Sequence, residues 1–248
     1  MTSPTRLLPV LSALVGVLLI AGCASSSPGS TTPSSSAAPS NSSDDGDSGG
    51  DDVDLDGTLL DDGRMFAVIT QGSSSLACIP QVGDVSANGQ TVDVTLEDTG
   101  DADQICTDDY VPRASIGALP EGVDPTKEIT LNVTYGDAVD DVDLDGDAAF
   151  TGRPGSSTDY LPSAGWIDDG ALVLLTWGSS SCPPVVESLE GAGSAGTATF
   201  VTDESKVCTM DMAPRATIIS FADDQVEDDG FTLTLVGGGL DGTVSVRG

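Results

Sequence analysis

The chain has 248 residues and a formal net charge of −32, from 40 acidic and 8 basic residues, and it contains no histidine. This charge argues against nucleic-acid binding, which needs lysine and arginine to neutralise phosphates, and against attraction to anionic lipid head groups. The lack of histidine removes Ser-His and Cys-His nucleophilic catalysis and nearly all zinc and copper sites except all-cysteine or carboxylate ones.

Residues 1–22 have the layout of a secretory signal. An apolar stretch runs from Leu7 to Ile20, and small residues precede Cys23. The stretch is shorter than the roughly 20 residues that a membrane-spanning helix needs. The sequence Ile-Ala-Gly-Cys that ends at Cys23 resembles the lipobox of bacterial lipoproteins. The resemblance implies that Cys23 is diacylated, that the preceding peptide is removed, and that the exported chain stays anchored to a membrane.

Residues 23–52 are mostly Ser, Gly, Pro, Thr and Ala, with Asp becoming frequent towards residue 52. Such a composition cannot bury enough apolar surface to form a core, so we expect a disordered tether with an end-to-end distance of roughly 30 Å.

The remaining sequence contains an internal repeat. Cys106–Ile116 matches Cys208–Ile218 with seven identical positions of eleven, and Thr70–Ser75 matches Thr176–Ser181 upstream. Order and spacing are both kept, so the repeat predicts two homologous units. We place them at 53–146 and 164–248, with residues 147–163 as a linker.

The cysteines fit this division. Five are present, and lipidation of Cys23 leaves four, which an exported protein is expected to join as two disulfides. Three pairings are possible in principle, and the repeat favours Cys78 with Cys106 and Cys182 with Cys208. Each bond closes a loop of about 27 residues, worth roughly 3 kcal/mol if unstrained.

Both units show the periodicity of strands. Short apolar or alternating runs bounded by turns occur at 64–70, 91–97, 129–135, 171–177, 195–202 and 231–235. No segment sustains a helical period. We therefore expect an all-β protein with two tandem small β-sandwich domains, each with one disulfide.

Two groups of residues in the repeat are candidate sites. The serines before the first cysteine of each unit are interpreted as tight loops, with disulfide-pinned recognition as their functional alternative: Ser73, Ser74, Ser75, Ser179, Ser180 and Ser181. They lack the lysine of a phosphate loop and a nearby base. An acid and an arginine follow each second cysteine, and we expect structural ion pairs between Asp109 and Arg113 and between Asp211 and Arg215.

Two acidic segments match the first half of a calcium loop, D-x-D-x-D-G. Their carboxylates are Asp52, Asp54, Asp56, Asp141, Asp143 and Asp145. The twelfth position, which should be a bidentate glutamate, is Gly63 in one and Gly152 in the other. We interpret both as acidic turns and predict no metal and no cofactor. Adjacent acids such as Asp108 and Asp109 could serve a carboxylate-based hydrolase, but aromatic residues that would hold a sugar are only 4% of the chain.

The repeated motifs resemble those of actinobacterial cell-surface lipoproteins with a lipobox, a Ser/Pro-rich tether, and domains carrying Gly-Ser-Ser-Ser-Cys-Pro and Cys-Thr-x-Asp-x-x-Pro-Arg. The residues that carry the likeness are 19–23, 70–80, 106–116, 176–184 and 208–218. In the first unit Leu76 and Ala77 are inserted before the cysteine. The resemblance implies location and fold, and no activity.

We therefore expect a membrane-anchored extracellular protein acting as a non-catalytic structural or interaction module. Its partners would be the membrane, through acylated Cys23, and an extracellular protein or cell-wall ligand, but no nucleic acid. The alternatives are a carboxylate-based envelope hydrolase, a calcium-stabilised adhesin, and a protease inhibitor. An inhibitor needs a protruding loop beside each disulfide, for which the Gly-Ser-Ser-Ser-Cys-Pro segments are the candidates.

Overall fold

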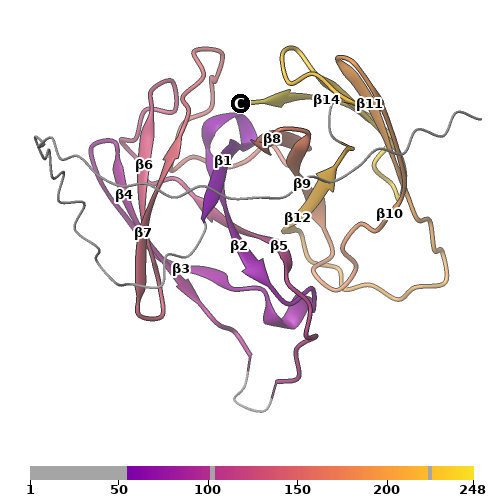
Figure 1. The fold of residues 1–248 in the computed structure, drawn as a ribbon, viewed down its shortest axis with the longest axis horizontal. Coiled ribbons are helices and arrows are strands. Elements are labelled where there is room, and N and C mark those ends of the chain that lie inside the picture. The colour runs from indigo at the N-terminus through magenta and orange to yellow at the C-terminus, as the bar shows by residue number, and fades with distance from the viewer. Residues whose placement is uncertain (1–54, 101–103, 223–224) are drawn as a thin grey trace, which may run out of the picture. The chain divides into compact units, whose positions relative to one another are not determined.

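The computed structural model describes residues 55–100, 104–222 and 225–248 (Figure 1). The predictions for Cys23, Asp52 and Asp54 lie outside these ranges. Within them the fold is all-β, as predicted, with fourteen strands and two short 3-10 turns, η1 (Asp61–Gly63) and η2 (Leu76–Cys78). Neither turn has the length and apolar composition that a membrane crossing requires.

The two repeats fold into the same succession of seven strands. The first contains β1 (Asp56–Leu60), β2 (Met65–Gly72), β3 (Gln81–Asn88), β4 (Thr91–Glu97), β5 (Val111–Ala118), β6 (Ile129–Tyr135) and β7 (Ala138–Leu144). The second contains β8 (Ser163–Asp168), β9 (Ala171–Gly178), β10 (Val186–Ala192), β11 (Ala195–Phe200), β12 (Ala213–Ser220), β13 (Thr232–Gly237) and β14 (Gly242–Arg247). The repeated Cys-Thr-x-Asp motif precedes β5 in one and β12 in the other.

Each repeat divides its strands between two sheets in the same order. The three-stranded sheets, β1-β2-β5 and β8-β9-β12, are antiparallel throughout. The four-stranded sheets, β3-β4-β6-β7 and β10-β11-β13-β14, each have a parallel pair in the middle. In the second repeat the two sheets also join at one edge, where Val246 pairs with Ala164 and Arg247 with Gly165. The second repeat therefore forms one continuous seven-stranded sheet, which the sequence did not indicate.

A separate apolar core lies between the two sheets of each repeat. In the first repeat the ring of Phe66 is fully buried over Gly117, where an added Cβ would lie 2.3 Å from the ring. In the second repeat the rings of Trp166 and Phe221 meet Phe231 edge-on, with centroids 5.1 and 5.5 Å away. Full burial of one such side chain contributes roughly 1.5–3 kcal/mol to folding.

A third core packs the two three-stranded sheets against each other. It contains Leu60, Ala67 and Ile69 of the first repeat and Val173 and Leu175 of the second. Because alternate residues of a strand point to opposite faces, β2 and β9 send one set of side chains to this core and the other to an outer core. Figure 1 shows the resulting order of layers, from β3, β4, β6 and β7 through the two three-stranded sheets to β10 and β11. All the described residues belong to one compact unit.

The central contact brings equivalent elements of the two repeats together. Strand β1 contacts β8, and β5 contacts β12. Thr58 and Gly165 each stand three residues before an Asp-Asp-Gly turn, and a Cβ on Gly165 would come within 2.1 Å of Thr58 Oγ1. Contacts between like elements are those of a two-fold symmetric interface.

The segment predicted as a linker packs on the first repeat. Phe150 is buried in the outer core of that repeat, and Thr158 Oγ1 donates a hydrogen bond to Asp61 Oδ1 at 3.0 Å. Where the segment ends, Ser163 Oγ accepts a hydrogen bond from the Asp61 amide at 2.8 Å. Asp61 therefore fastens the connection between the repeats.

The Asp61 carboxyl is an unusual group because it is only 4% exposed and its Oδ2 has no hydrogen-bond partner. Burial raises the pKa of Asp61 above its usual range, although the hydrogen bond from Thr158 and the charge of Arg64 act in the opposite direction. A folded state that holds the proton more tightly than the unfolded chain loses stability as pH rises above the unfolded pKa of about 3.9.

We expect Asp61→Asn to remove this pH-dependent loss. Asparagine tolerates the left-handed backbone of position 61, where φ is 49°. The difference in unfolding free energy, variant minus wild type, should therefore become more positive between about pH 4 and pH 7. Urea unfolding of both proteins over this range measures the difference. A difference that stays constant with pH would contradict the assignment of Asp61.

Candidate functional site

The structure confirms the predicted disulfides, Cys78–Cys106 and Cys182–Cys208. Each disulfide lies at the end of a three-stranded sheet. In the first repeat it lies between the ends of β2 and β5, and in the second between those of β9 and β12. The residues around each second cysteine form an irregular segment that leads into the next strand. We call residues 104–110 loop 1 and residues 206–212 loop 2. The segment that contains loop 1 projects at the lower end of Figure 1.

Hydrogen bonds hold loop 1 to the serine segment before the first cysteine. The Thr107 amide donates to Ser73 Oγ at 3.0 Å, and the Ser74 amide donates to Asp109 Oδ1 at 3.0 Å. The Thr107 hydroxyl also donates to Asp109 Oδ1. This last hydrogen bond links Thr107 to Asp109 across Asp108.

Loop 2 repeats this arrangement with its own residues. The Thr209 amide donates to Ser181 Oγ at 3.0 Å, the Ser180 amide donates to Asp211 Oδ1 at 3.2 Å, and the Thr209 hydroxyl donates to Asp211. The serines that the sequence suggested as recognition residues therefore support the loop after the second cysteine. The recurring Cys-Thr-x-Asp motif was the signal that pointed to this loop.

The two loop aspartates are firmly ionised. Hydrogen bonds from Ser74 and Thr107 lower the pKa of Asp109 to about 2, and the equivalent donors lower the pKa of Asp211 to about 2. A lowered pKa stabilises the folded state above the unfolded value of about 3.9, and this stabilisation is lost as pH falls towards 2. Both carboxylates are therefore ionised, and able to accept these hydrogen bonds, above about pH 4.

An arginine holds the backbone around the first cysteine of each disulfide. Arg113 donates to the carbonyl oxygens of Cys78 at 2.7 Å and Gln71 at 3.2 Å. Arg215 does the same to Cys182 and Trp177, at 3.0 and 2.9 Å. Each guanidinium therefore ties the first cysteine to the strand before it.

The salt bridges of the described ranges do not include the predicted pairs Asp109–Arg113 and Asp211–Arg215, although the charge of Asp211 acts on Arg215. The carboxylates are turned to amide and hydroxyl donors, and the guanidinium groups lie under the glycine of each Gly-Ser-Ser-Ser segment. A Cβ at Gly72 would lie 2.6 Å from Arg113 Cζ, so a larger residue here would displace the guanidinium.

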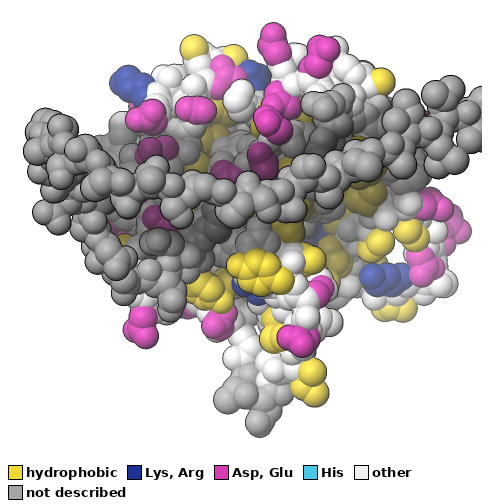
Figure 2. Space-filling view, in the orientation of Figure 1, with side chains coloured by type: hydrophobic (Ala, Val, Ile, Leu, Met, Phe, Trp, Pro, Cys, Tyr) yellow, Lys and Arg dark blue, Asp and Glu magenta, His cyan; other side chains and the backbone are white. Residues whose placement is uncertain are grey.

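Both loops carry exposed apolar side chains. They are Ile105 and Tyr110 in loop 1 and Val207, Met210 and Met212 in loop 2, and Leu76 of η2 is exposed as well. Met210 is completely exposed, and every residue from 206 to 212 is accessible. Figure 2 shows hydrophobic side chains gathered at the lower end of the molecule, where the first of these segments projects. No pattern in the sequence predicted this exposure directly.

A cleft of about 370 Å³ lies beside loop 2. Its lining includes Pro183, Pro184, Val185 and Val201, together with the basic side chain of Lys206. The cleft is continuous with the disulfide, because Cys182 and Cys208 also line it. Loop 2 therefore stands next to a largely apolar hollow.

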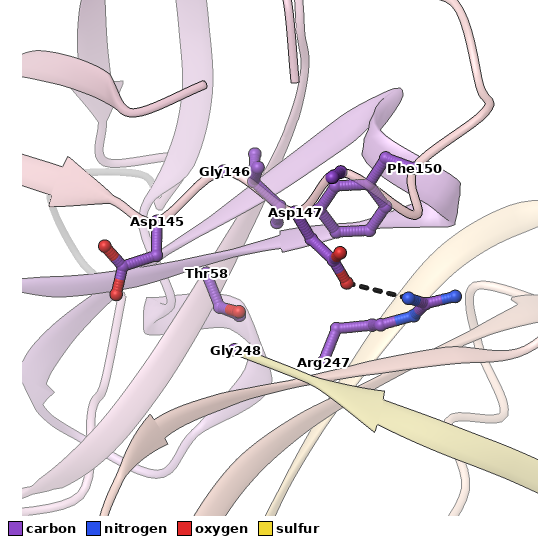
Figure 3. A pocket seen from close by; sticks show the side chains of 9 residues that line it. Thr58, Asp145, Gly146, Asp147, Phe150, Arg247 and Gly248 are labelled. Atoms are coloured by element: carbon purple, nitrogen blue, oxygen red, sulfur yellow. Dashed lines mark hydrogen bonds and ion pairs between the residues drawn. The ribbon is translucent and has the colours of Figure 1, made fainter. Parts of the chain in front are cut away.

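A second cleft, of about 430 Å³, surrounds Arg247 near the end of β14 (Figure 3). Arg247 Nη1 donates to Asp147 Oδ2 at 2.7 Å, and the guanidinium lies 5.6 Å from the centre of the Phe150 ring. Figure 3 shows the Asp145 carboxylate pointing away from this pair. Arg247 and Asp147 in this cleft are paired with each other and belong to the packing between the repeats.

The calcium-like segment at 141–146 begins as a strand. Asp141 and Asp143 lie on the outer face of β7, alternating with buried Val142 and Leu144. Carboxylates two residues apart on a strand are separated by roughly 6.6 Å, too far to meet on one ion without a turn. The described parts of the chain contain no cluster of three potential metal-binding side chains. Asp56 lies in β1, which contacts β7.

Comparison of the chain with protein-family models, with curated proteins and with solved structures gave no match. The likeness to actinobacterial cell-surface lipoproteins therefore stays a prediction from its motifs.

Proposed function

We propose that this protein is a lipid-anchored extracellular binding protein without catalytic activity, which recognises a protein partner through loops 1 and 2. The observation that carries the proposal is the set of exposed apolar side chains on two loops that disulfides and hydrogen bonds hold in place. Exposed apolar groups on a soluble surface mark interaction sites, and loops on a rigid scaffold commonly carry binding. Little entropy is lost when such loops bind, because they are already ordered.

The charge of the chain defines the kind of partner that fits. With a net charge of −32, the protein attracts surfaces that carry lysine and arginine and repels acidic ones. The partner would present apolar pockets for the loop side chains and a basic rim around them.

The acids near the loops also support binding over hydrolysis. A carboxylate-based hydrolase needs one acid with a raised pKa as proton donor beside an ionised one. Asp109 and Asp211 instead have a pKa of about 2 and are occupied in holding the loops. Among the carboxyls of residues 55–100, 104–222 and 225–248, the one with a raised pKa is Asp61, which is buried at the connection between the repeats.

The membrane location rests on the signal layout and on Cys23. A diacylated cysteine carries two chains, which suffice for stable anchoring. We expect Cys23→Ser to release the protein from the membrane fraction of expressing cells, and fractionation with immunoblotting measures this. Retention of the variant in the membrane fraction would contradict a lipid anchor at this residue.

Capture of surface proteins tests the binding role. The full chain and a Tyr110→Ser/Met210→Ser variant are immobilised and exposed to the same surface extract, and captured proteins are quantified by mass spectrometry. Because exposed hot-spot residues typically contribute at least about 2 kcal/mol each, partner recovery should fall more than ~30-fold. Val139→Ser changes an exposed apolar residue of β7 and serves as the matched control. Equal capture by the loop variant and the wild type would overturn the proposal.

A further inference from the structure

We infer that loop 2 is a substrate-like binding loop for a serine endopeptidase with an apolar S1 pocket. Met210 is the residue that enters the pocket, and the bond between Met210 and Asp211 is the reactive peptide bond. This inference rests on the proposed function, and it gives the partner a chemical class and the loop a stoichiometric inhibitory role.

The exposure of loop 2 meets the first requirement of such a loop. A serine protease places one side chain of its substrate in the S1 pocket and attacks the carbonyl that follows that side chain. Met210 is completely exposed at a bend outside any strand, and its neighbours on both sides are exposed as well. A long, unbranched methionine side chain fits an apolar slot and adapts to its shape.

The second requirement is that the loop is rigid, because a flexible loop would be cleaved as a substrate instead of acting as an inhibitor. The Thr209 hydroxyl donates to the Asp211 carboxylate, so this hydrogen bond spans the reactive bond. Upstream the chain is fixed by the Cys208 disulfide, and downstream Asp211 accepts the Ser180 amide. A loop already held in its bound geometry binds tightly, as protease–inhibitor interfaces generally do.

The same contacts determine what happens after attack. The protease serine Oγ attacks the Met210 carbonyl carbon and forms an ester. The C–N bond to Asp211 breaks, and the Asp211 nitrogen takes a proton. Because Asp211 stays tied to Thr209 and Ser180, its amine remains beside the ester, attacks it, restores the peptide bond and returns the serine with its proton. No water is consumed, so the complex persists.

Loop 1 supplies an internal contrast. It has the same hydrogen bonds between Thr107 and Asp109, but the residue at the position of Met210 is Asp108. An apolar pocket rejects a carboxylate because burial leaves the charge without a partner. Loop 1 should therefore not engage the same enzyme, although its scaffold is equivalent.

Titration of purified full chain in detergent against chymotrypsin, which has an apolar S1 pocket, and trypsin, which has an anionic one, tests the inference. We expect one chymotrypsin to be inhibited per chain and trypsin to be unaffected. Met210→Lys should reverse this preference, weakening chymotrypsin inhibition at least ~100-fold and creating trypsin inhibition. Asp108→Met should raise the stoichiometry to two chymotrypsin molecules per chain. Any slow cleavage of the wild type should fall at Met210–Asp211, as seen by mass spectrometry.

Thr209→Val removes the hydrogen bond across the reactive bond and tests rigidity separately. It should turn loop 2 into a substrate that is cut rapidly at the same bond. Lack of chymotrypsin inhibition by the wild type, or inhibition that Met210→Lys leaves unchanged, would overturn the inference. If partner capture still depends on Tyr110 and Met210 in that event, the proposed binding role stands without a protease. If capture is also independent of these residues, both fail.

Discussion

Phe66→Ala is expected to lower the unfolding free energy by about 3–5 kcal/mol, the largest loss that we predict for a single residue. The ring is completely buried and stands over Gly117, in the outer core of the first repeat. Its removal leaves a cavity between two sheets whose backbones are fixed by strand pairing, so collapse recovers little of the loss. The two tryptophans, Trp166 and Trp177, both lie in the second repeat. Urea unfolding followed by tryptophan fluorescence therefore reports this change from the other repeat.

The readout also tests whether the central core makes the repeats unfold together. A shared core predicts that tryptophan fluorescence and far-ultraviolet circular dichroism shift to the same lower midpoint. Tyr110→Ala is the matched aromatic control, because Tyr110 is 77% exposed and its loss should change stability by no more than about 0.5 kcal/mol. A fluorescence midpoint that Phe66→Ala leaves in place would show that the repeats unfold independently.

Cys78→Ser/Cys106→Ser is expected to cost about 3 kcal/mol, because the disulfide closes a loop of roughly 27 residues in the unfolded chain. Cys182→Ser/Cys208→Ser removes a loop of nearly the same length and should cost a similar amount. Urea unfolding of both variants in the absence of reductant measures each effect.

Reduction of the wild type with dithiothreitol is the control for the serine substitutions themselves. Reduction should lower the unfolding free energy by the sum of the losses in the two variants. A loss below about 1 kcal/mol in either variant would contradict the entropic account. In the second repeat the variant should also free loop 2 upstream of Met210, so inhibition of chymotrypsin should weaken together with stability.

The all-β class and the disulfide pairs could be predicted because both depend on local or repeated signals. Strict alternation in 91–97 is a property of the strand itself, and β4 has those bounds. The pairing of Cys78 with Cys106 followed from spacing kept in both repeats. Neither prediction required knowing which sheet packs on which.

The central core could not be predicted, because burial on a second face depends on a partner sheet. The apolar runs of β2 and β9 lacked alternation, which is typical of strands covered on both sides. These apolar runs did not indicate that the three-stranded sheet of each repeat covers that of the other. The partners of Asp109 could not be predicted either, because they depend on local hydrogen bonding. The Ser74 amide and the Thr107 hydroxyl donate to its carboxylate, which therefore does not rely on the charge of Arg113.

The contact between like elements in the central core has an evolutionary consequence. A single repeat with this apolar face, carrying residues such as Ile69 or Leu175, would expose it unless a second copy covered it. Duplication and fusion of such a gene would convert a homodimer, whose assembly depends on concentration, into one chain with a permanently high effective concentration of the second half. Once joined, the halves were free to diverge at single positions, and Asp108 and Met210 differ in this way on otherwise equivalent loops.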